Sequence, residues 1–280
     1  EVNNLLFKVH PYGQQSTLGT IEHLKNPSIT AIEDFYATHY VPNNMAICIS
    51  GDIDPDKTFE IIEENFSSWK RSESLRPEPK WDEKSLQGRE FVQVKYLGEE
   101  QLLMAFQTAP RFHQDYPALR LIDMILDNSV AGLINLNLVE RQAVRAAGCF
   151  PQSYNDYGAH YLYGIPKDGQ SMEEVENLLL NQVELVKKGE FADWILPAVL
   201  NDFKKSQKEN LESNPKRVEL LRDSFLSFVD WEVMDQEIQD LEKVTKEDVV
   251  RVANKYFGED YVVGFRVDQQ HDLPSIEKPK

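Results

Sequence analysis

Three side chains that can bind zinc, His10, Glu22 and His23, lie close together in the turn-rich stretch "HPYGQQSTLGTIEHL", residues 10–24. Two imidazoles and a carboxylate can hold Zn²⁺, and a metal held in this way can activate a bound water. A zinc site is therefore one interpretation of this stretch. The other is that these residues are structural or solvent-exposed, because surface histidines greatly outnumber metal ligands.

The composition is that of an ordinary globular protein of one or two domains, with 280 residues, 41% hydrophobic and 28% charged. The 30 basic and 47 acidic residues give a net charge of -17, which argues against nucleic acid as a partner. Cys48 and Cys149 lie far apart in apolar stretches and are interpreted as buried thiols.

The cellular location of the protein is left open by the sequence. No apolar run approaches the about 20 residues that cross a bilayer, so we expect a soluble chain without a membrane span. The chain begins "EVNNLLFKVH", with neither an initiator Met nor a secretory signal. We expect it to be a piece of a longer protein, whose targeting peptide, if any, would precede residue 1.

The first 66 residues predict two helices with a strand between them. Ser28 or Thr30 caps a helix that ends before Pro42, and the apolar run "MAICIS", residues 45–50, predicts a buried strand. Asp54 then caps a second amphipathic helix that begins at Pro55. Residues 67–88 are polar and aperiodic, which indicates a linker.

The rest of the chain predicts an α+β domain. Two hairpins are expected, one with strands on either side of residues 97–100 and one around residues 155–158, and a last strand at "YVVGFRV". Helical periodicity covers residues 116–127, 131–144, 171–188 and a block at about 193–257 that is broken near residues 214–215. The sequence therefore predicts an antiparallel sheet with helices packed on one face.

A helix-turn-strand pattern occurs twice, in "SITAIEDFYATHYVPNNMAICISGD" and "KVTKEDVVRVANKYFGEDYVVGFRVD". Each copy has a Thr cap, an acidic first turn, a helix that ends at Tyr, and an apolar strand. A duplicated domain explains this repeat, and convergence of capping and turn residues is the alternative. If the domain is duplicated, Thr245 lies 157 positions after Gly88 but only 29 residues precede Thr30, so the first copy is truncated.

The N-terminal stretch resembles the pitrilysin/insulinase family of zinc metallopeptidases. The residues that carry the resemblance are His10-Pro11-Tyr12-Gly13, Leu18-Gly19-Thr20, Phe35, Tyr40-x-Pro42-x-Asn44-Met45 and Gly51-Asp52. The stretches "PALRLIDMILDNSVAGLINLNLVE" and "SYNDYGAHYLYGIP" are similar to the family's weaker second-domain pattern. The resemblance implies two homologous α+β domains in each half-molecule, and two halves that close around an unfolded peptide.

The resemblance also implies a catalytic zinc on an inverted His-x-x-Glu-His helix that precedes the His-Pro-Tyr-Gly loop. A motif that ends at Glu22-His23 requires a histidine at position 19, which is Gly19, and Leu18-Gly19-Thr20 interrupts a helix there. We therefore expect no catalytic residue and no metal ligand in this chain. His39, His113 and His160 are interpreted as structural, and the aspartates at positions 54, 56 and 115 as caps or turn formers.

The family's second domain carries an Arg and a Tyr that hold substrate near the zinc, in a Leu-Arg-Glu-x-x-Gly-x-x-Tyr stretch. The corresponding stretch here is "LVERQAVRAAGCF", where Val139 takes the Arg place and no Tyr follows, only Phe150. Arg141 and Arg145 supply charge nearby, although solvation on a helix surface also explains them. We predict Arg141, Arg145 and Phe150 as substrate-binding residues.

Together these observations predict the organisation of the chain. Residues 1–66 are expected to be the C-terminal part of a first peptidase-like domain, 67–88 a linker, 89–270 the second domain, and 271–280 the start of a tail.

The predicted function is that of an internal fragment of a zinc metalloendopeptidase, inactive alone, with zinc bound only in the parent protein, upstream of residue 1. It would form chamber wall and peptide-binding surface, with an unfolded peptide, the missing first-domain segment and a second half-molecule or subunit as partners. The alternatives are a non-catalytic partner or assembly subunit of an active peptidase and an unrelated acidic binding module.

Overall fold

The computed structural model describes residues 1–73, 75, 79–128 and 131–268. The chain forms two compact units, each built from separate stretches of sequence. We call Glu1–Gln14, Asp82–Phe203 and Ile238–Lys280 the sheet unit, and Gln15–Trp81 and Lys204–Glu237 the helical unit. None of the described helices is both long enough and apolar enough to span a bilayer.

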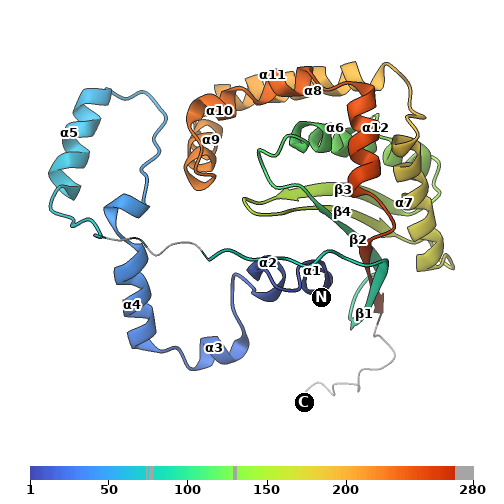
Figure 1. Cartoon of the computed structure of the whole chain (residues 1–280), viewed down its shortest axis with the longest axis horizontal. Coiled ribbons are helices and arrows are strands. Elements are labelled where there is room, and N and C mark those ends of the chain that lie inside the picture. The colour runs from blue at the N-terminus through green and yellow to red at the C-terminus, as the bar shows by residue number, and fades with distance from the viewer. Residues whose placement is uncertain (74, 76–78, 129–130, 269–280) are drawn as a thin grey trace, which may run out of the picture. The chain divides into compact units, whose positions relative to one another are not determined.

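A five-stranded sheet in the order β1-β5-β2-β4-β3 forms the centre of the sheet unit (Figure 1). The strands are β1 (Arg89–Tyr96), β2 (Gln101–Thr108), β3 (Ala146–Ser153), β4 (Gly158–Ile165) and β5 (Tyr261–Asp268). The pairs β2–β4, β3–β4 and β2–β5 are antiparallel, whereas β1 and β5 are parallel. The sheet is therefore mixed, with one parallel pair at an edge.

One of the two predicted hairpins is confirmed and the other is wrong. Strands β3 and β4 pair directly around residues 154–157. Strands β1 and β2 form where they were expected, but β5 lies between them. The reason is burial. Tyr261, Val263 and Phe265 are buried on one face of β5 and Val262 on the other. The backbone N–H and C=O groups along both edges of β5 are therefore shielded from water and need a strand partner on each side.

Helices cover one face of this sheet, as the α+β prediction required. Helices α6 (Tyr116–Leu126), α7 (Met172–Lys187) and α12 (Lys246–Tyr256) pack on the face that carries Met104, Leu162 and Val263 (Figure 1). The opposite face is partly covered as well, because Leu6 and Phe7 at the end of α1 (Val2–Leu6) pack against Ala105, Tyr161 and Val262.

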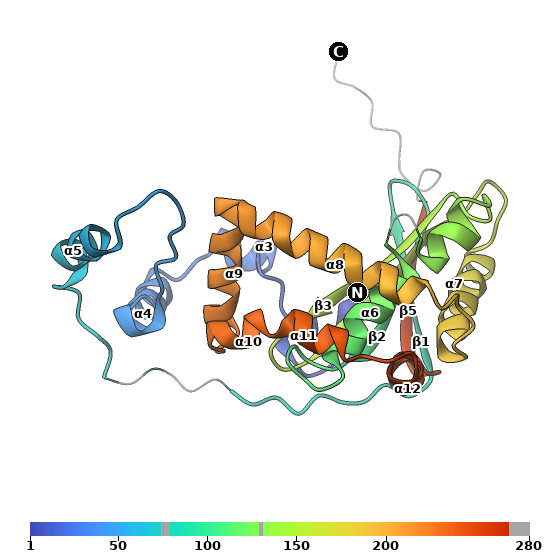
Figure 2. The same cartoon turned by 90° about the horizontal axis from the view of Figure 1, so that it is seen from above.

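The helix starts follow the capping residues of the sequence. Ser171 and Thr245 each form a capping box, with Glu174 at the start of α7 and with Asp248 at the start of α12. The predicted C-terminal helical block consists of α8 (Ile195–Glu212), α9 (Asn214–Leu226), α10 (Trp231–Asp235), α11 (Glu237–Glu242) and α12, which Figure 2 shows from above. The expected break before Pro215 is confirmed.

The predicted helix at residues 131–144 is confirmed only in its middle part. Residues 133–134 are α-helical and continue into the π-helical turn η2 (Asn135–Val139), and β3 begins at Ala146. Leu138 and Val144 are both buried, although only Leu138 is helical, so an apolar residue beyond 139 marks burial without a helix. Gln142 adopts a left-handed φ of 53°, which reverses the chain into β3.

The helical unit contains α3 (Ile21–Lys25), α4 (Ile29–His39), η1 (Pro42–Asn44) and α5 (Pro55–Phe66), together with α9 and α10. Ser28 caps α4 and the Asp54 side chain caps α5, as expected. The predicted strand at residues 45–50 does not form. The described residues of the helical unit contain no strand, so the backbone of residues 45–50 has no ladder to join.

Gly13 closes a tight turn in the sheet unit and should not tolerate a side chain. A Cβ at this position would lie 2.2 Å from the carbonyl oxygen of Asn3 and 2.3 Å from that of Phe7. We expect Gly13→Ala to lower the free energy of unfolding by about 2 kcal/mol, because the backbone of α1 must move. Chemical denaturation measures this loss, and Gly258→Ala is the control because a Cβ there meets nothing within 4 Å.

Candidate functional site

His10 is a buried structural residue of the sheet unit. Its Nε2 lies 3.1 Å from Asp156 Oδ2, and its Nδ1 accepts a hydrogen bond from the Tyr12 backbone N–H. The backbone N–H groups of Val9 and His10 donate to the carboxylate of Glu83. Both ring nitrogens of His10 therefore have partners within the protein.

Glu22 and His23 lie on the short exposed helix α3 of the helical unit. Gly19 has a positive φ of 72°, and Thr20 caps the helix by accepting a hydrogen bond from the His23 backbone N–H. The interruption of the helix at residues 18–20 is thus confirmed. Among the described residues, neither Glu22 nor His23, nor His10, belongs to a cluster of three potential metal ligands.

The predicted substrate-binding residues Arg141, Arg145 and Phe150 lie within one short stretch that leads into the edge strand β3. The guanidinium of Arg145 is exposed and forms an ion pair with Glu99. Phe150 lies on β3 and stacks on Tyr161, with ring centroids 5.0 Å apart and an interplanar angle of 13°. Arg141 is exposed in the turn after η2.

The other histidines and aspartates singled out in the sequence have structural surroundings. His39 lies in the last turn of α4, and His113 Nδ1 accepts a hydrogen bond from the Asp115 backbone N–H. Asp115 lies in a turn at the N-cap position of α6, as expected, but its side chain forms no capping hydrogen bond. Instead, its fully buried carboxylate accepts hydrogen bonds from Arg251 and Lys255 on α12.

Asp123, Cys149 and His160 form a cluster that sequence reasoning missed. One potential ligand atom from each lies within 4.8 Å of the others. The Cys149 Sγ donates to Asp123 Oδ1 at 3.4 Å, and His160 Nε2 lies 3.6 Å from the same oxygen. The sequence separates these residues by up to 37 positions, so no motif spacing reveals them, although a Cys and a His on the two strands of one predicted hairpin are a weak signal.

Burial shifts the pKa of each of the three groups of this cluster in the direction that favours its neutral form. Burial raises the pKa of Asp123 to about 6, in spite of the hydrogen bond from Cys149. Burial, followed by the negative charge of Asp123, raises the pKa of the Cys149 thiol well above its ordinary value. Burial lowers the pKa of His160 to about 3. The cluster therefore holds an uncharged imidazole and thiol near a carboxyl that titrates near neutral pH.

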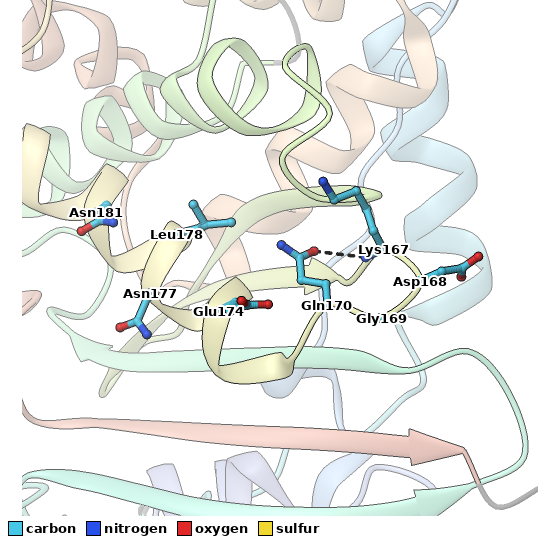
Figure 3. A pocket seen from close by; sticks show the side chains of 8 residues that line it. All are labelled: Lys167, Asp168, Gly169, Gln170, Glu174, Asn177, Leu178 and Asn181. Atoms are coloured by element: carbon cyan, nitrogen blue, oxygen red, sulfur yellow. Dashed lines mark hydrogen bonds between the residues drawn. The ribbon is translucent and has the colours of Figure 1, made fainter.

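A shallow polar depression of about 530 Å³ lies where the β4–α7 connection meets the first turns of α7 (Figure 3). The dashed line in Figure 3 is the hydrogen bond from the Lys167 backbone N–H to Gln170 Oε1, at 3.1 Å. Gln170 Nε2 donates to the Ala143 carbonyl, and the Glu174 carboxylate accepts from the Ser171 backbone N–H. These polar groups secure the start of α7, and we assign no chemistry to the depression.

Comparison with known proteins gives a consistent family. The family description that matches residues 28–202 is "Peptidase M16 inactive domain". The zinc protease PqqE of Helicobacter pylori is 26% identical over 263 residues, which are 91% of this chain and 58% of that protein. The β subunit of the mitochondrial processing peptidase of Saccharomyces cerevisiae is 20% identical over 269 residues, 90% of this chain and 58% of that protein.

Solved structures share the fold. A protease from Helicobacter pylori superposes with a TM-score of 0.88 at 22% identity, covering 95% of this chain and 65% of that one. The periplasmic protease PqqL from Escherichia coli gives a TM-score of 0.73 at 14% identity over 95% of this chain and 31% of that one. The chain thus spans less than two thirds of these relatives. Because the family match covers more than half of its residues, the chain belongs to the M16 family of pitrilysin/insulinase-type peptidases, in the region described as the inactive domain.

Proposed function

We propose that this chain is a non-catalytic part of a zinc-dependent metalloendopeptidase, which contributes chamber wall and peptide-binding surface. The observation that carries the proposal is the match of residues 28–202 to the inactive domain of the M16 family. The zinc protease PqqE extends well beyond the matched region, which leaves room for a catalytic zinc site in residues that precede this chain.

The domain organisation that we propose is the one expected from the repeat. Residues 1–66 close a first peptidase-like domain, 67–88 connect it to a second domain at 89–270, and 271–280 begin a tail. Helices α4 and α12 of the repeat are both capped and both end at or next to a Tyr, which supports this organisation, although the cap of α4 is Ser28 and not Thr30. After α12 the chain forms the strand β5, whereas after α4 residues 45–50 have no strand partner among the described residues.

The apolar surface of the helical unit supports a partner segment from the same protein. Large apolar side chains of α4 and α5 are exposed, and they belong to Ile32, Phe35, Tyr36, Phe59 and Ile61. Ile32, Phe35 and Tyr36 lie at i, i+3 and i+4 on one face of α4, and apolar patches of this kind mark interaction sites in soluble proteins. We propose that they pack against the rest of the first domain, which would also supply the strand that residues 45–50 lack.

Arg141, Arg145 and Phe150 are the residues that we propose for the peptide-binding surface. They precede or lie on β3, an edge strand of the sheet, beside which an extended peptide could lie. The exposed guanidinium groups would attract the carboxylates of such a peptide, and Phe150 would offer an aromatic surface beside them.

We expect the isolated chain to hydrolyse no unstructured fluorogenic peptide, with or without added Zn²⁺, because it lacks the His-x-x-Glu-His segment. The longer protein that contains such a segment should hydrolyse the peptide and lose this activity on treatment with a chelator. Hydrolysis by the 280-residue chain that a chelator abolishes would contradict the proposal. Zinc binding alone would not, because binding and hydrolysis are separate properties.

In the longer protein, the double substitution Arg141→Ala and Arg145→Ala should raise KM about three- to tenfold and leave kcat within about twofold. Two exposed charges each contribute up to about 1 kcal/mol to binding. Lys208→Ala removes a charge from the exposed surface of α8 and is the control. An unchanged KM in the double variant would show that Arg141 and Arg145 do not contribute to peptide binding.

A second candidate function is that of a non-catalytic partner or assembly subunit of an active peptidase. The specific observation in its favour is the description of the matched family region as an inactive domain. The two functions differ in the longer protein, since a partner subunit would lack His-x-x-Glu-His and would hydrolyse peptides only in the presence of an active subunit.

A further inference from the structure

The register of the β3–β4 hairpin brings Cys149 and His160 to the same face of the sheet. Cys149 pairs with Leu162, and His160 lies two residues before Leu162 on the same strand, so all three side chains point to one side. Leu162 is part of the core beneath α6, α7 and α12. Asp123 reaches the same place from α6, which packs on β3.

From this convergence we propose that Asp123, Cys149 and His160 bind one Zn²⁺, or a similar late first-row divalent cation, through a carboxylate oxygen, a thiolate and an imidazole nitrogen. The site is separate from the proposed peptidase function, because its ligands come from α6, β3 and β4 and include no His-x-x-Glu-His motif. It would tie α6 to the β3–β4 hairpin.

The distances within the cluster suit a tetrahedral ion. Zinc bonds of about 2.0–2.3 Å place neighbouring ligand atoms about 3.3–3.7 Å apart in a tetrahedron. The Asp123 Oδ1 to Cys149 Sγ distance is 3.4 Å and the Asp123 Oδ1 to His160 Nε2 distance is 3.6 Å. A ring nitrogen of His160 also lies within 4.8 Å of Cys149 Sγ, so the three ligand groups surround one position.

The imidazole of His160 supplies independent support. The residue is 1% exposed, and its Nε2 has no hydrogen-bond partner among the described residues. A buried polar atom without a partner destabilises a fold by about 1–3 kcal/mol, so such atoms are rare. A metal bound to Nε2 would satisfy this atom and account for a histidine in an otherwise apolar layer.

The donor set and the access to the site favour zinc over magnesium or calcium. A thiolate and an imidazole are ligands for zinc and for later transition metals, whereas hard cations prefer sets of oxygen ligands. The side chain of Asp123 is 17% exposed, which gives an ion a route from solvent and leaves room for a water as fourth ligand. Three protein ligands and a water form a common zinc geometry.

Without a metal, the Cys149 thiol donates a hydrogen bond to Asp123 Oδ1. A divalent cation would replace the thiol proton and hold the carboxylate in its charged form, so binding should release protons and strengthen as the pH rises.

The test uses the metal-free chain, reduced with a phosphine that does not bind zinc. Competition with a chromophoric chelator should give one high-affinity Zn²⁺ per chain, and Co²⁺ should produce a thiolate-to-cobalt charge-transfer band. Cys149→Ser and Asp123→Asn keep side-chain size, and each should weaken Zn²⁺ binding at least about tenfold, the loss that even outer-shell changes cause at zinc sites. Cys149→Ser should also abolish the charge-transfer band.

Cys48→Ser is the matched control, because it removes the other free thiol and should leave both readouts unchanged. The absence of Zn²⁺ binding by the folded wild-type chain would overturn the proposal. So would binding that persists in both Cys149→Ser and Asp123→Asn, or a charge-transfer band that Cys48→Ser removes. The wild-type Co²⁺ spectrum reports thiolate ligation even where a variant does not fold. Neither readout depends on peptidase activity, so the two proposals can fail independently.

Discussion

Glu176→Ala should lower the free energy of unfolding by about 3–4 kcal/mol, the largest effect that we expect from a single substitution in this chain. The buried Glu176 carboxylate on α7 accepts a bidentate pair of hydrogen bonds from Arg89 of β1, at 2.6 and 2.7 Å. It also accepts a hydrogen bond of 2.7 Å from the Tyr261 hydroxyl of β5. One side chain therefore joins a helix to two strands.

The expected loss of unfolding free energy depends on the groups that are left without a partner when the carboxylate is removed. Breaking a buried ion pair by removing one partner costs about 3–5 kcal/mol. The lower part of this range applies, because the Arg89 side chain is 39% exposed and water can solvate it. The buried Tyr261 hydroxyl loses its acceptor, which adds to the loss.

Chemical denaturation followed by circular dichroism and tryptophan fluorescence measures the effect. Glu173→Ala, at an exposed position on the same helix, is the control and should change the free energy of unfolding by less than about 0.5 kcal/mol. Burial, followed by the hydrogen bond to Glu176, raises the pKa of Tyr261 to about 12. In Glu176→Gln this pKa should fall toward 10, and an unchanged alkaline titration would show that the carboxylate does not act on Tyr261.

Asp115→Asn should lower the free energy of unfolding by about 2–3 kcal/mol at neutral pH. The fully buried carboxylate accepts hydrogen bonds from Arg251 at 2.9 Å, Lys255 at 2.6 Å and Tyr256 at 3.0 Å. These bonds join the start of α6 to α12. Hydrogen bonds to charged groups contribute about 1.5–3 kcal/mol, and the partial exposure of the two cations keeps the sum modest.

The pH dependence of stability distinguishes this carboxylate from an ordinary polar contact. Burial alone would raise the pKa of Asp115, but the hydrogen bonds from Lys255, Arg251 and Tyr256 outweigh it and lower the pKa from 3.8 to about 2. Because the folded pKa lies below the unfolded one, the stabilisation of about 2 kcal/mol is complete above about pH 4–5 and is lost as the pH falls toward 2.

The difference in unfolding free energy between the wild type and Asp115→Asn should therefore be constant from pH 5 to 8 and should shrink below pH 4. Denaturation curves at a series of pH values measure this difference. Asp168→Asn, at an exposed position in the β4–α7 connection, is the control and should show no such trend. If the difference in unfolding free energy stays constant down to pH 2, the charge of Asp115 does not stabilise the packing of α12 on α6.

The sequence predicted local structure correctly wherever a side chain forms a hydrogen bond with the backbone of the residues next to it. Ser28, Asp54 and Thr245 cap the helices that they were expected to cap, because a cap needs only the next three residues. The interruption at Gly19 is of the same kind. The α+β class followed from the strand and helix patterns, which do not depend on which strands pair.

Pairing and burial depended on contacts between distant parts of the chain. The strand β5 separates β1 from β2, since a strand that is buried on both faces needs two neighbours whatever the loop between β1 and β2 favours. The apolar run at residues 45–50 forms no strand because a strand requires a partner. The Asp115 side chain forms no capping hydrogen bond, because it accepts hydrogen bonds from Arg251 and Lys255 of α12, more than 130 residues later.

The sequence by itself determined the family of this protein and excluded a His-x-x-Glu-His motif at residues 10–24, because Gly19 stands where a ligand would have to be. Only the tertiary structure decided which potential metal ligands meet. Within the part of the chain that the structure describes, His10 and His23 belong to no ligand cluster, whereas His160 lies against Asp123 and Cys149, which are 37 and 11 positions away in the sequence. The physical reason is that ligands converge through strand register and helix packing, and neither is encoded in the spacing along the chain.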